Sequence, residues 1–320
     1  MTDEVIDQLV TFVHDYYLGI TSLSIGWYGG EPLLALDKIQ LITARLKEVV
    51  GPSCFYGASI VTNGYLLTPN VAKALAECDI RTVQVTIDGS KADHDSRRIL
   101  HDGTPTFDRI LQNVKDCAEI LDISIRSNVD KTNIESAAEM FEYLERNGLK
   151  NKVHFYLAPV DNINDVCIND SRCFTVKEFS REETEFYKRA INAGFKVTPF
   201  GGTNLGICCA VSMNSYVVDP LGDLYKCWDD IGRKERKVGT IFEQPMLSKN
   251  MVRWMSYEPN DQECHTCFAF PMCMGGCPNH TLNGSEKRCV SFRYDAKQKM
   301  LLSKMMKDVE HAAETNTDHA

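Results

Sequence analysis

The first 160 residues alternate between two kinds of segment, and this alternation restricts the fold more than any other feature of the sequence. Short segments rich in β-branched and aromatic residues, typical of strands, occupy residues 22–27, 56–62, 82–87, 123–129 and 153–159. Segments with apolar residues at helical spacing occupy residues 3–18, 38–50, 69–78, 107–121 and 133–147. Strict β/α alternation predicts a parallel sheet or barrel, with functional residues at the carboxyl ends of the strands.

The remainder of the chain has a different texture, with short strands, turns and many cysteines. We expect a helix over residues 181–192, a β-hairpin over residues 216–225 and a closing helix over residues 292–311. The boundary between the two parts of the chain lies near residues 195–205. The fold class we predict is therefore an α/β part followed by a smaller, cysteine-rich α+β part.

Composition and charge exclude several classes of protein. The 35 basic and 44 acidic side chains give a net charge of −9, which argues against a nucleic-acid partner. No apolar run approaches the roughly 18 residues that a membrane helix needs, so we expect no membrane partner. The acidic first residues lack the basic start and apolar core of a signal peptide. We therefore expect a cytoplasmic protein.

Eight of the 13 cysteines gather between residues 208 and 289. They are Cys208, Cys209, Cys227, Cys264, Cys267, Cys273, Cys277 and Cys289. In a chain without an export signal, clustered cysteines predict metal or redox ligands rather than disulfides. Gly275 and Gly276 would let the backbone approach such a centre closely. A structural zinc ribbon is the alternative, although zinc usually takes two separated Cys-x2-Cys pairs and this region has one.

Polar motifs occur at the ends of successive expected strands. In chain order they are Gly29-Gly30-Glu31-Pro32, Thr62-Asn63-Gly64, Thr86-Ile87-Asp88-Gly89 with His94-Asp95-x-Arg97 after it, and the pair Arg126 and Asn128 on the fourth strand. Each motif alone is compatible with ordinary turn chemistry. Four of them at successive strand ends predict one shared site.

Together these motifs resemble those of the radical S-adenosylmethionine (SAM) enzymes that carry a SPASM domain. The seven-cysteine pattern of that domain, Cys–x9–15–Gly–x4–Cys, a gap, Cys–x2–Cys–x5–Cys–x3–Cys, a gap, Cys, is satisfied at every spacing. The resemblance extends from about residue 3 to residue 300. It implies a partial (β/α)6 TIM-type barrel over residues 1–200, a SPASM domain over 201–300, and the end of a helix and a tail over 301–320.

The resemblance also implies two auxiliary 4Fe–4S clusters. One would be bound by a first cysteine set, namely Cys208, Cys227 and Cys277. The other would be bound by a second cysteine set, namely Cys264, Cys267, Cys273 and Cys289. The fourth ligand of the first cluster stays open. Cys209 would point away from Cys208 if both lay in an extended strand, so an open iron, Cys167 or Cys173 are the alternatives.

SAM is the other implied cofactor. Its amino group would be held by the turn formed by Gly29, Gly30, Glu31 and Pro32, largely through backbone oxygens. Thr86, Asp88, Arg126 and Asn128 would complete the site, with the last two near the carboxylate and the ribose. No residue of the chain is marked as a catalytic acid or base.

One family motif does not occur in the 320 residues. The Cys-x3-Cys-x2-Cys loop, which binds the catalytic 4Fe–4S cluster of full-length family members, is absent. In the family this loop follows the first strand, so we expect a chain that is truncated at its N-terminus and lacks that strand. Cys54, Cys78 and Cys117 cannot replace the loop because they lie far apart, on or after helices. We expect all three to be buried free thiols.

The implied function is side-chain modification of a peptide or protein, as in the maturation of ribosomal peptides or sulfatases. In such enzymes a SAM-derived radical abstracts a hydrogen from the substrate, and a reductant such as flavodoxin or ferredoxin supplies the electron. Two alternatives stay open: an inactive homologue that binds a peptide and transfers electrons, and the product of a late start codon. An in-frame cysteine loop in the upstream DNA would support the late start codon.

Overall fold

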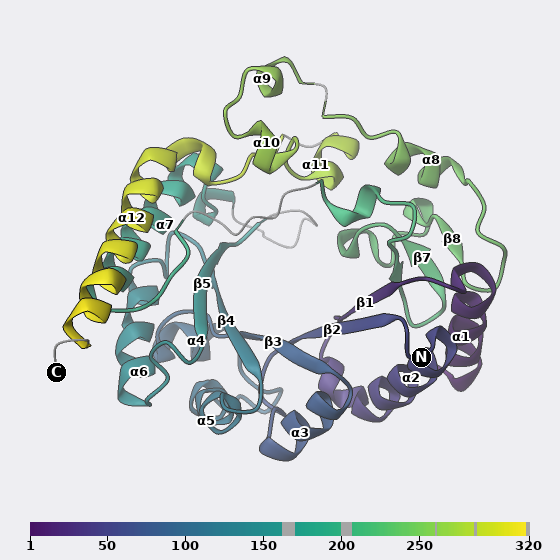
Figure 1. Ribbon diagram of the computed structural model, residues 1–320, viewed down its shortest axis with the longest axis horizontal. Helices are drawn as coiled ribbons and strands as arrows, with labels where there is room; N and C mark the ends of the chain where they lie inside the picture. The colour runs from purple at the N-terminus through teal and green to yellow at the C-terminus, as the bar shows by residue number, and fades with distance from the viewer. Residues whose placement is uncertain (162–169, 200–206, 260, 285–286, 318–320) are drawn as a thin grey trace.

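The computed structural model describes residues 1–161, 170–199, 207–259, 261–284 and 287–317. Its main element is a parallel five-stranded sheet in chain order, formed by β1 (Ser22–Trp27), β2 (Phe55–Thr62), β3 (Ile80–Thr86), β4 (Asp122–Val129) and β5 (His154–Pro159). The sheet curves into an open arc with helices on its outer side (Figure 1). The predicted partial barrel with five visible strands is confirmed.

The helices around this sheet follow the expected alternation. They are α1 (Asp3–Tyr17), α2 (Leu36–Val50), α3 (Pro69–Glu77), α4 (Lys91–Arg97), α5 (Phe107–Cys117), α6 (Met140–Arg146) and α7 (Val176–Asn192), with 3₁₀ turns at Pro32–Ala35, Ser136–Glu139 and Asp170–Arg172. Helix α4 was not expected from the sequence. Helix α7 begins earlier than predicted because Thr175 and Glu178 form a capping box at its start.

The strands bury one face against the helices and turn a more polar face toward the inside of the arc. In β4, Ile123, Ile125 and Val129 are buried in the core that the helices share. Arg126 and Asn128 alternate with them and are only half-buried. The inside of the arc is therefore lined with polar groups that can bind a ligand.

A small antiparallel sheet follows, made of β6 (Val217–Val218), β7 (Asp223–Tyr225) and β8 (Gly239–Thr240). The expected hairpin is thus present. Helix α1 joins this sheet to the barrel, because its Phe12 packs in one core with Leu224 and Trp254. On another face of α1, Ile6 packs in a core with Leu46 of α2.

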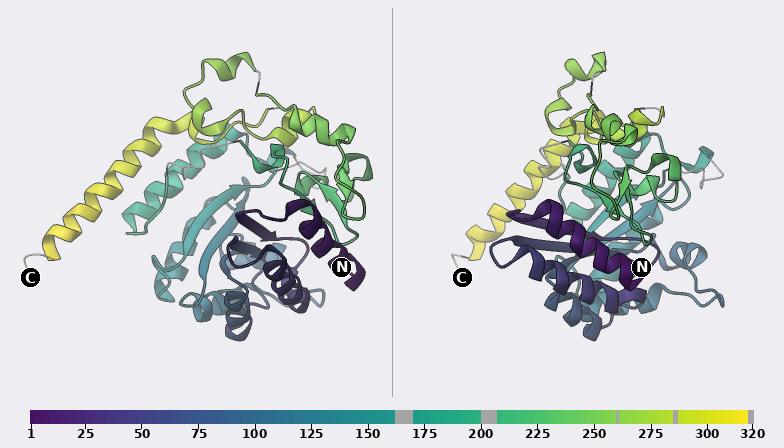
Figure 2. Two further views of the ribbon diagram at one scale, coloured as in Figure 1. Left: turned by 45° about the vertical axis from the view of Figure 1, so that its right-hand side comes forward. Right: turned by 90° about the vertical axis from the view of Figure 1, so that its right-hand side faces the viewer.

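The remaining helices are α8 (Lys249–Met255), α9 (Gln262–His265), α10 (Phe270–Cys273), α11 (Pro278–Leu282) and α12 (Phe292–Thr317), with further 3₁₀ turns at Cys209–Val211, Trp228–Asp230 and Lys234–Arg236. Helix α12 is kinked at Asp295, packs beside α7 and projects from the body of the molecule (Figure 2). The buried amine of Lys299 on α12 pairs with Glu183 on α7. Neither α12 nor any other helix of the described residues is long and apolar enough to cross a membrane.

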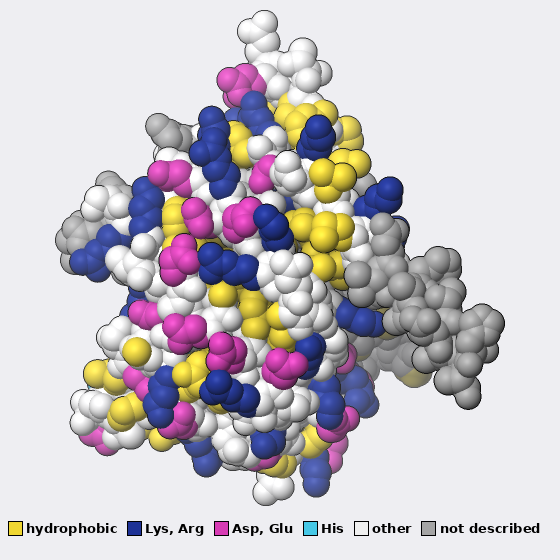
Figure 3. Space-filling model, turned by 90° about the vertical axis from the view of Figure 1, so that its left-hand side faces the viewer, with side chains coloured by type: hydrophobic (Ala, Val, Ile, Leu, Met, Phe, Trp, Pro, Cys, Tyr) yellow, Lys and Arg dark blue, Asp and Glu magenta, His cyan; other side chains and the backbone are white. Residues whose placement is uncertain are grey.

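The face of the molecule drawn in Figure 3 carries basic and acidic side chains side by side. It offers no continuous basic field of the kind that favours a polyanion. The tail residues 318–320 and the glycines at 201 and 202, where the texture of the sequence changes, lie outside the described residues.

Candidate functional site

The Glu31 side chain links the carboxyl ends of β1 and β2 through hydrogen bonds. Its carboxylate accepts hydrogen bonds from the Thr62 hydroxyl at 2.7 Å and from the backbone N–H of Asn63 at 2.8 Å. It also accepts from the Leu33 N–H at 3.0 Å and so caps the 3₁₀ turn that begins at Pro32. Both carboxylate oxygens are engaged within the fold, so any ligand at this turn must use the backbone.

The two glycines before Glu31 leave that backbone accessible. Gly29 and Gly30 are exposed, and no atom lies within 4 Å of the position that a Cβ would occupy on either residue. A small ligand can therefore approach the Gly29–Gly30 backbone closely, as the sequence analysis expects for the amino group of SAM.

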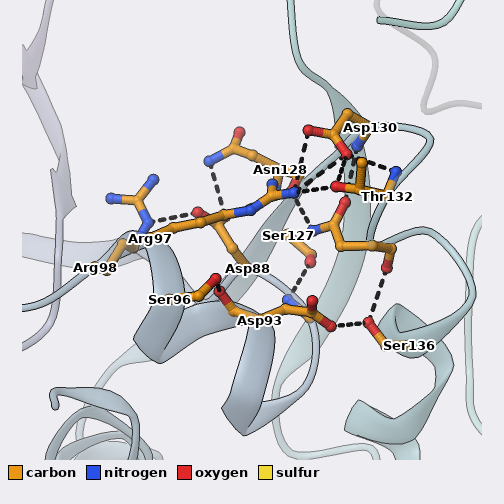
Figure 4. Close-up of polar contacts among 12 residues, drawn as sticks. Asp88, Asp93, Ser96, Arg97, Arg98, Ser127, Asn128, Asp130, Thr132 and Ser136 are labelled. Carbon is orange, nitrogen blue, oxygen red and sulfur yellow. Dashed lines mark hydrogen bonds and ion pairs between the residues drawn. The ribbon is translucent and has the colours of Figure 1, made fainter. Parts of the chain in front are cut away.

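Asp88 connects the carboxyl ends of β3 and β4 (Figure 4). Its Oδ1 accepts from the backbone N–H of Asn128 at 2.9 Å and from the side-chain amide of Asn128 at 3.1 Å. Its Oδ2 pairs with Nε of Arg98 at 2.6 Å. The Asn128 amide oxygen in turn accepts from Nε of Arg126 at 3.0 Å. The structure therefore brings three of the expected site residues, Asp88, Arg126 and Asn128, into one hydrogen-bonded chain.

Thr86, the fourth of these residues, is buried and lies opposite Arg126 in the β3–β4 register. Among the described residues the Arg126 guanidinium donates through Nε to Asn128, and its terminal nitrogens can donate to an anion such as a carboxylate. All these groups and the Gly29–Pro32 turn share the edge of the sheet where the strands end. We call it the carboxyl edge.

Arg97 forms a second ion pair beside this chain. Its Nη2 lies 3.1 Å from both carboxylate oxygens of Asp130 and 2.8 Å from the Thr132 hydroxyl. Burial raises the pKa of Asp130, but hydrogen bonds from Thr132 and the charge of Arg97 outweigh burial and leave the pKa below its ordinary value. The pair fixes the loop after β4 next to helix α4.

His94 is fully buried under this network and is neutral. Its Nδ1 accepts from the Asp88 backbone N–H at 3.2 Å, so Nδ1 carries no proton. The Thr106 hydroxyl donates to the Arg98 carbonyl at 2.6 Å, so it accepts the proton of His94 Nε2 at 3.0 Å. Burial lowers the pKa of His94 below its ordinary value. His94 therefore supports the Asp88 backbone rather than acting as a metal ligand.

The cysteine-rich part of the chain lies over the same carboxyl edge. The ring of Trp228 stacks on that of Tyr28, the residue before Gly29, with centroids 5.6 Å apart. Arg288 forms an ion pair with Asp161, which follows β5, and Nε2 of His280 lies 3.6 Å from the same carboxylate. These contacts at both ends of the arc bring the segments between the cysteines toward the expected SAM residues.

The first cysteine set gathers around Cys277. Burial raises the pKa of Cys208, and the nearby thiols of Cys209 and Cys277 raise it further. Burial also raises the pKa of Cys227, with smaller effects from nearby acidic groups and Cys277. Cys277 therefore lies close to both other members of the set, as the SPASM pattern requires.

Cys209 differs from the expectation. In an extended strand Cys208 and Cys209 would point to opposite faces, but Cys208 instead caps a 3₁₀ turn that begins at Cys209. In this turn the two thiols are near enough for Cys209 to raise the pKa of Cys208. The geometric objection to Cys209 as a fourth ligand is therefore wrong. Cys167 lies outside the described residues, and Cys173 is half-buried just after the Asp170–Arg172 turn.

Two members of the second cysteine set accept hydrogen bonds from cations. Nζ of Lys287 lies 2.5 Å from the sulfur of Cys264, and Nη1 of Arg293 lies 2.9 Å from the sulfur of Cys289. Arg293 also interacts electrostatically with Cys267. The three cysteines thus share the same cationic surroundings, and Cys273 ends helix α10.

Gly275 and Gly276 join the two sets. Both have positive φ angles, +94° and +84°, and a Cβ on Gly276 would lie 2.1 Å from the Arg288 carbonyl oxygen. The loop that carries Cys277 therefore lies directly against the segment that carries Cys289. Only glycine permits this approach, as the sequence analysis expects.

The donor set has the chemistry that iron–sulfur clusters require, because it consists of cysteine thiols. Within the described residues, no three His, Cys, Asp or Glu side chains gather closely enough to hold one ion. A structural zinc needs four ligands at about 2.0–2.3 Å around one point. A cubane takes its thiolates on separate iron atoms, so its ligands are spread more widely. Thiolates in two neighbouring sets agree with that arrangement.

The other cysteines of the barrel have structural roles. Cys54, Cys78 and Cys117 are buried free thiols, as predicted. Burial raises the pKa of Cys117 to about 11, and its thiol donates to the Leu67 carbonyl at 3.3 Å. Cys54 precedes β2, and Cys78 and Cys117 lie at the ends of helices α3 and α5. The three cysteines therefore do not belong to the candidate site at the carboxyl edge.

Several residues of the site were not found from the sequence. Arg98, Ser127 and Lys287 gain their roles from partners that lie 10, 38 and 23 residues away in the chain, and Arg293 from Cys289, four residues before it. The Ser127 hydroxyl on β4, for example, accepts a hydrogen bond at 2.9 Å from the backbone N–H of Gly89, which follows β3. The cations near the last cysteines were visible in the sequence, but Lys and Arg are too common for their presence to mark a site.

Comparison with known proteins identifies a domain in the first part of the chain. Residues 1–144 match the family model of the Radical SAM superfamily. The chain therefore contains a radical SAM domain, which implies SAM and 4Fe–4S chemistry. The expected family resemblance is confirmed.

Two relatives of the chain indicate which radical SAM enzymes it resembles. The chain is 25% identical over 289 residues to the mycofactocin maturase MftC of Mycobacterium tuberculosis, which covers 82% of this chain and 69% of the relative. It is 24% identical over 304 residues to the cysteine-type anaerobic sulfatase-maturating enzyme of Clostridium novyi, which covers 84% and 78%. The chain is homologous to these maturases.

A solved structure shows the same fold. The structure of anSMEcpe with bound AdoMet and the Kp18Cys peptide superposes with a TM-score of 0.70 at 19% identity, over 97% of this chain and 91% of that one. The agreement over nearly the whole length includes the cysteine-rich part as well as the barrel.

Proposed function

We propose that this chain is a radical SAM protein of the type that modifies a side chain of a peptide or protein. Its homology to a peptide maturase and to a sulfatase-maturating enzyme supports this substrate class. The fold it shares with a structure that holds both AdoMet and a peptide supports it further.

One structural observation carries the proposal. The Tyr28–Trp228 stack and the Asp161–Arg288 ion pair hold the cysteine-rich part over the carboxyl edge of the barrel. A substrate side chain between the two parts would therefore face both the expected SAM residues and the cysteines. Such a layout suits chemistry in which hydrogen abstraction and electron removal occur at neighbouring sites.

In this proposal the chain's own residues bind and orient SAM. The exposed backbone of Gly29 and Gly30 receives the amino group, and Glu31 holds that turn in place through Thr62. Arg126 binds the carboxylate through the guanidinium nitrogens that Asn128 leaves free. In a protein that also carries the Cys-x3-Cys-x2-Cys loop, SAM bound here would supply the radical that abstracts hydrogen, once a reductant such as flavodoxin or ferredoxin has delivered one electron.

We further propose that residues 1–200 act as the SAM barrel, that residues 201–300 hold two auxiliary 4Fe–4S clusters, and that residues 301–320 end the chain as helix and tail. The first cysteine set, with Cys209 as its fourth member, would bind one cluster, and the second set the other. The proximity of Cys277 to Cys208 and Cys227 supports this grouping, as do the hydrogen bonds that Cys264 and Cys289 each accept from a cation.

Anaerobic reconstitution tests the cofactors. We expect roughly eight iron and eight sulfide per chain, the content of two cubanes, with the charge-transfer absorption of iron–sulfur clusters. Equilibrium dialysis with SAM then tests the barrel. Arg126→Gln should weaken SAM binding about tenfold or more, since a hydrogen bond to a charged group contributes roughly 1.5–3 kcal/mol. Arg81→Gln, which removes an exposed charge near the start of β3, is the matched control.

Either of two results would overturn the proposal. Stoichiometric zinc without iron–sulfur absorption would favour the zinc ribbon. Equal SAM affinities of wild type, Arg126→Gln and Arg81→Gln would remove Arg126 from the site.

A second candidate function is a peptide-binding, electron-transfer iron–sulfur protein. The two cysteine sets beside the carboxyl edge support it, because clusters held there could transfer electrons without SAM cleavage. In the family SAM cleavage requires a Cys-x3-Cys-x2-Cys loop, which the given 320 residues do not contain. We expect these 320 residues, incubated with dithionite and SAM, to give no 5′-deoxyadenosine above a cluster-free control. Formation of 5′-deoxyadenosine in that chromatographic assay would show that the chain is itself a SAM-cleaving enzyme.

A further inference from the structure

Two cations donate hydrogen bonds directly to sulfurs of the second cysteine set. Lys287 contacts Cys264 at 2.5 Å and Arg293 contacts Cys289 at 2.9 Å. The two contacts are made to different cysteines and come from opposite sides of Cys289 in the chain. Thiolates that bind iron keep lone pairs for such bonds, so cations at these positions can also donate to the sulfurs of a cluster.

Carboxylates on either side of Cys264 hold both cations in place. Lys287 pairs with Asp261 at 3.1 Å, and Arg293 pairs with Glu263 at 3.0 Å. The carboxylates are much more exposed, at 46% and 69%, than the cations, at 22% and 26%. Water therefore screens the negative charges more than the positive ones, and the net field at the sulfurs is positive.

The first cysteine set has different surroundings. The thiol of Cys227 lies 3.6 Å from a carboxylate oxygen of Asp229. The nearby amine of Lys226 donates instead to the backbone carbonyls of Ser212 and Ser215. Cation-to-sulfur hydrogen bonds thus distinguish the second set from the first within the part of the chain that the structure describes.

We propose that Lys287 and Arg293 are positioning residues that raise the reduction potential of the cluster held by Cys264, Cys267, Cys273 and Cys289. This inference rests on the proposed function, since it assumes a cluster on the second set. One-electron reduction takes the 4Fe–4S core from 2+ to 1+, so the centre with its four thiolates goes from 2− to 3−. The electron comes from a low-potential one-electron donor, such as a flavodoxin, or dithionite in the test.

The physical reason is the charge added on reduction. No bond forms or breaks, and no proton moves, because Lys287 and Arg293 keep their protons in both states. A positive charge and an N–H donor at a ligand sulfur stabilise the more negative, reduced form. Removing one cation should therefore make that cluster harder to reduce and leave the other cluster unchanged.

A redox titration followed by electron paramagnetic resonance tests this on the reconstituted full chain. The variants are Lys287→Gln and Arg293→Gln, each with a charge-keeping partner, Lys287→Arg and Arg293→Lys. The matched control is Lys304→Gln, an exposed lysine on α12. It lies eleven residues beyond Arg293, about 16 Å along a helix, which is beyond the screening length of about 10 Å at 0.1 M salt.

We expect each glutamine variant to shift one of the two reduction waves to lower potential. The charge-keeping variants should restore most of the shift, and Lys304→Gln should cause none. Because the cations bind different cysteines, Lys287→Gln decides the question if Arg293→Gln loses iron, and the reverse also holds.

Unchanged potentials in iron-loaded variants would overturn this inference alone. Equal shifts in Lys304→Gln would overturn it too, because they would show a general charge effect. A wild-type chain that takes up no cluster on the second set would overturn the proposed cofactors together with it, and iron analysis identifies that case before any titration.

Discussion

Replacing Gly276 with alanine should separate the two cysteine sets. The new Cβ would lie 2.1 Å from the Arg288 carbonyl oxygen, 3.1 Å from its carbon and 3.8 Å from the Cα of Cys289. Ordinary contacts begin near 3.4 Å, so the Gly276 and Arg288 backbones must separate by about 1 Å. The neighbouring atoms are backbone, which cannot rotate away as a side chain does.

The expected cost has two parts. An alanine at φ +84° costs about 1–2 kcal/mol, because left-handed backbone is unfavourable for residues with a Cβ. Forcing an extra carbon into a packed site costs about 1–3 kcal/mol more. We therefore expect the free energy of unfolding to fall by about 2–5 kcal/mol.

Gly284→Ala provides a matched control. Gly284 has a similar φ of +73°, but no atom lies within 4 Å of its expected Cβ position. Gly284→Ala should lower the free energy of unfolding only by the backbone contribution, about 1–2 kcal/mol. The difference between the two variants then isolates the steric effect at the contact between Gly276 and Arg288.

Denaturant unfolding and iron content measure this prediction. Gly276→Ala should also lose iron, since it displaces Cys277 of the first set relative to Cys289 of the second, whereas Gly284→Ala should retain it. Equal destabilisation of both variants, with full iron in each, would refute the close approach of the two segments.

Two further predictions concern the second cysteine set and the buried histidine. Cys273→Ala should lose about half of the iron and sulfide, because a cubane with three thiolates is labile, and the cysteine-rich part should become more sensitive to protease; full iron content would show that Cys273 is not a ligand. Burial lowers the pKa of His94, so its folded form is neutral and its contribution to stability is complete above the unfolded pKa of about 6.5. As the pH falls below that value, the unfolded chain binds the proton first, and the free energy of unfolding should decrease by up to about 1.4 kcal/mol per pH unit until the folded pKa is reached. Urea unfolding at pH 7.5 and 5.5 should show a smaller decrease for His94→Gln than for wild type, and equal decreases would contradict a buried neutral His94.

The sequence by itself determined the elements that depend on neighbouring residues. Short segments rich in β-branched and aromatic residues were sufficient to predict all five strands of the barrel, because such side chains favour the extended backbone of a strand. The Gly29–Pro32 turn and the cysteine spacings could also be recognised from the sequence, because each motif lies within a short stretch of chain.

Local patterns failed where the backbone left the expected conformation. In an extended strand Cys208 and Cys209 would point to opposite faces, but they begin a 3₁₀ turn that brings their thiols together. Helix α7 begins at Val176 because Thr175 and Glu178 cap it. Polar residues that could cap a helix occur at several positions in this region, and tertiary packing determines which of them forms the cap. Ser180 instead donates to the Ser291 carbonyl of the segment before α12.

Only the tertiary structure decided which groups meet at the site. The Asp88 carboxylate takes its partners from Arg98 and from Asn128, forty residues further along the chain. Lys287 reaches Cys264 across 23 residues. Hydrogen bonds and ion pairs depend on distances of about 3 Å between atoms, and sequence spacing does not define such distances once the chain has turned back on itself. The sequence thus determined the class of chemistry, and the fold determined which charges surround each cysteine set.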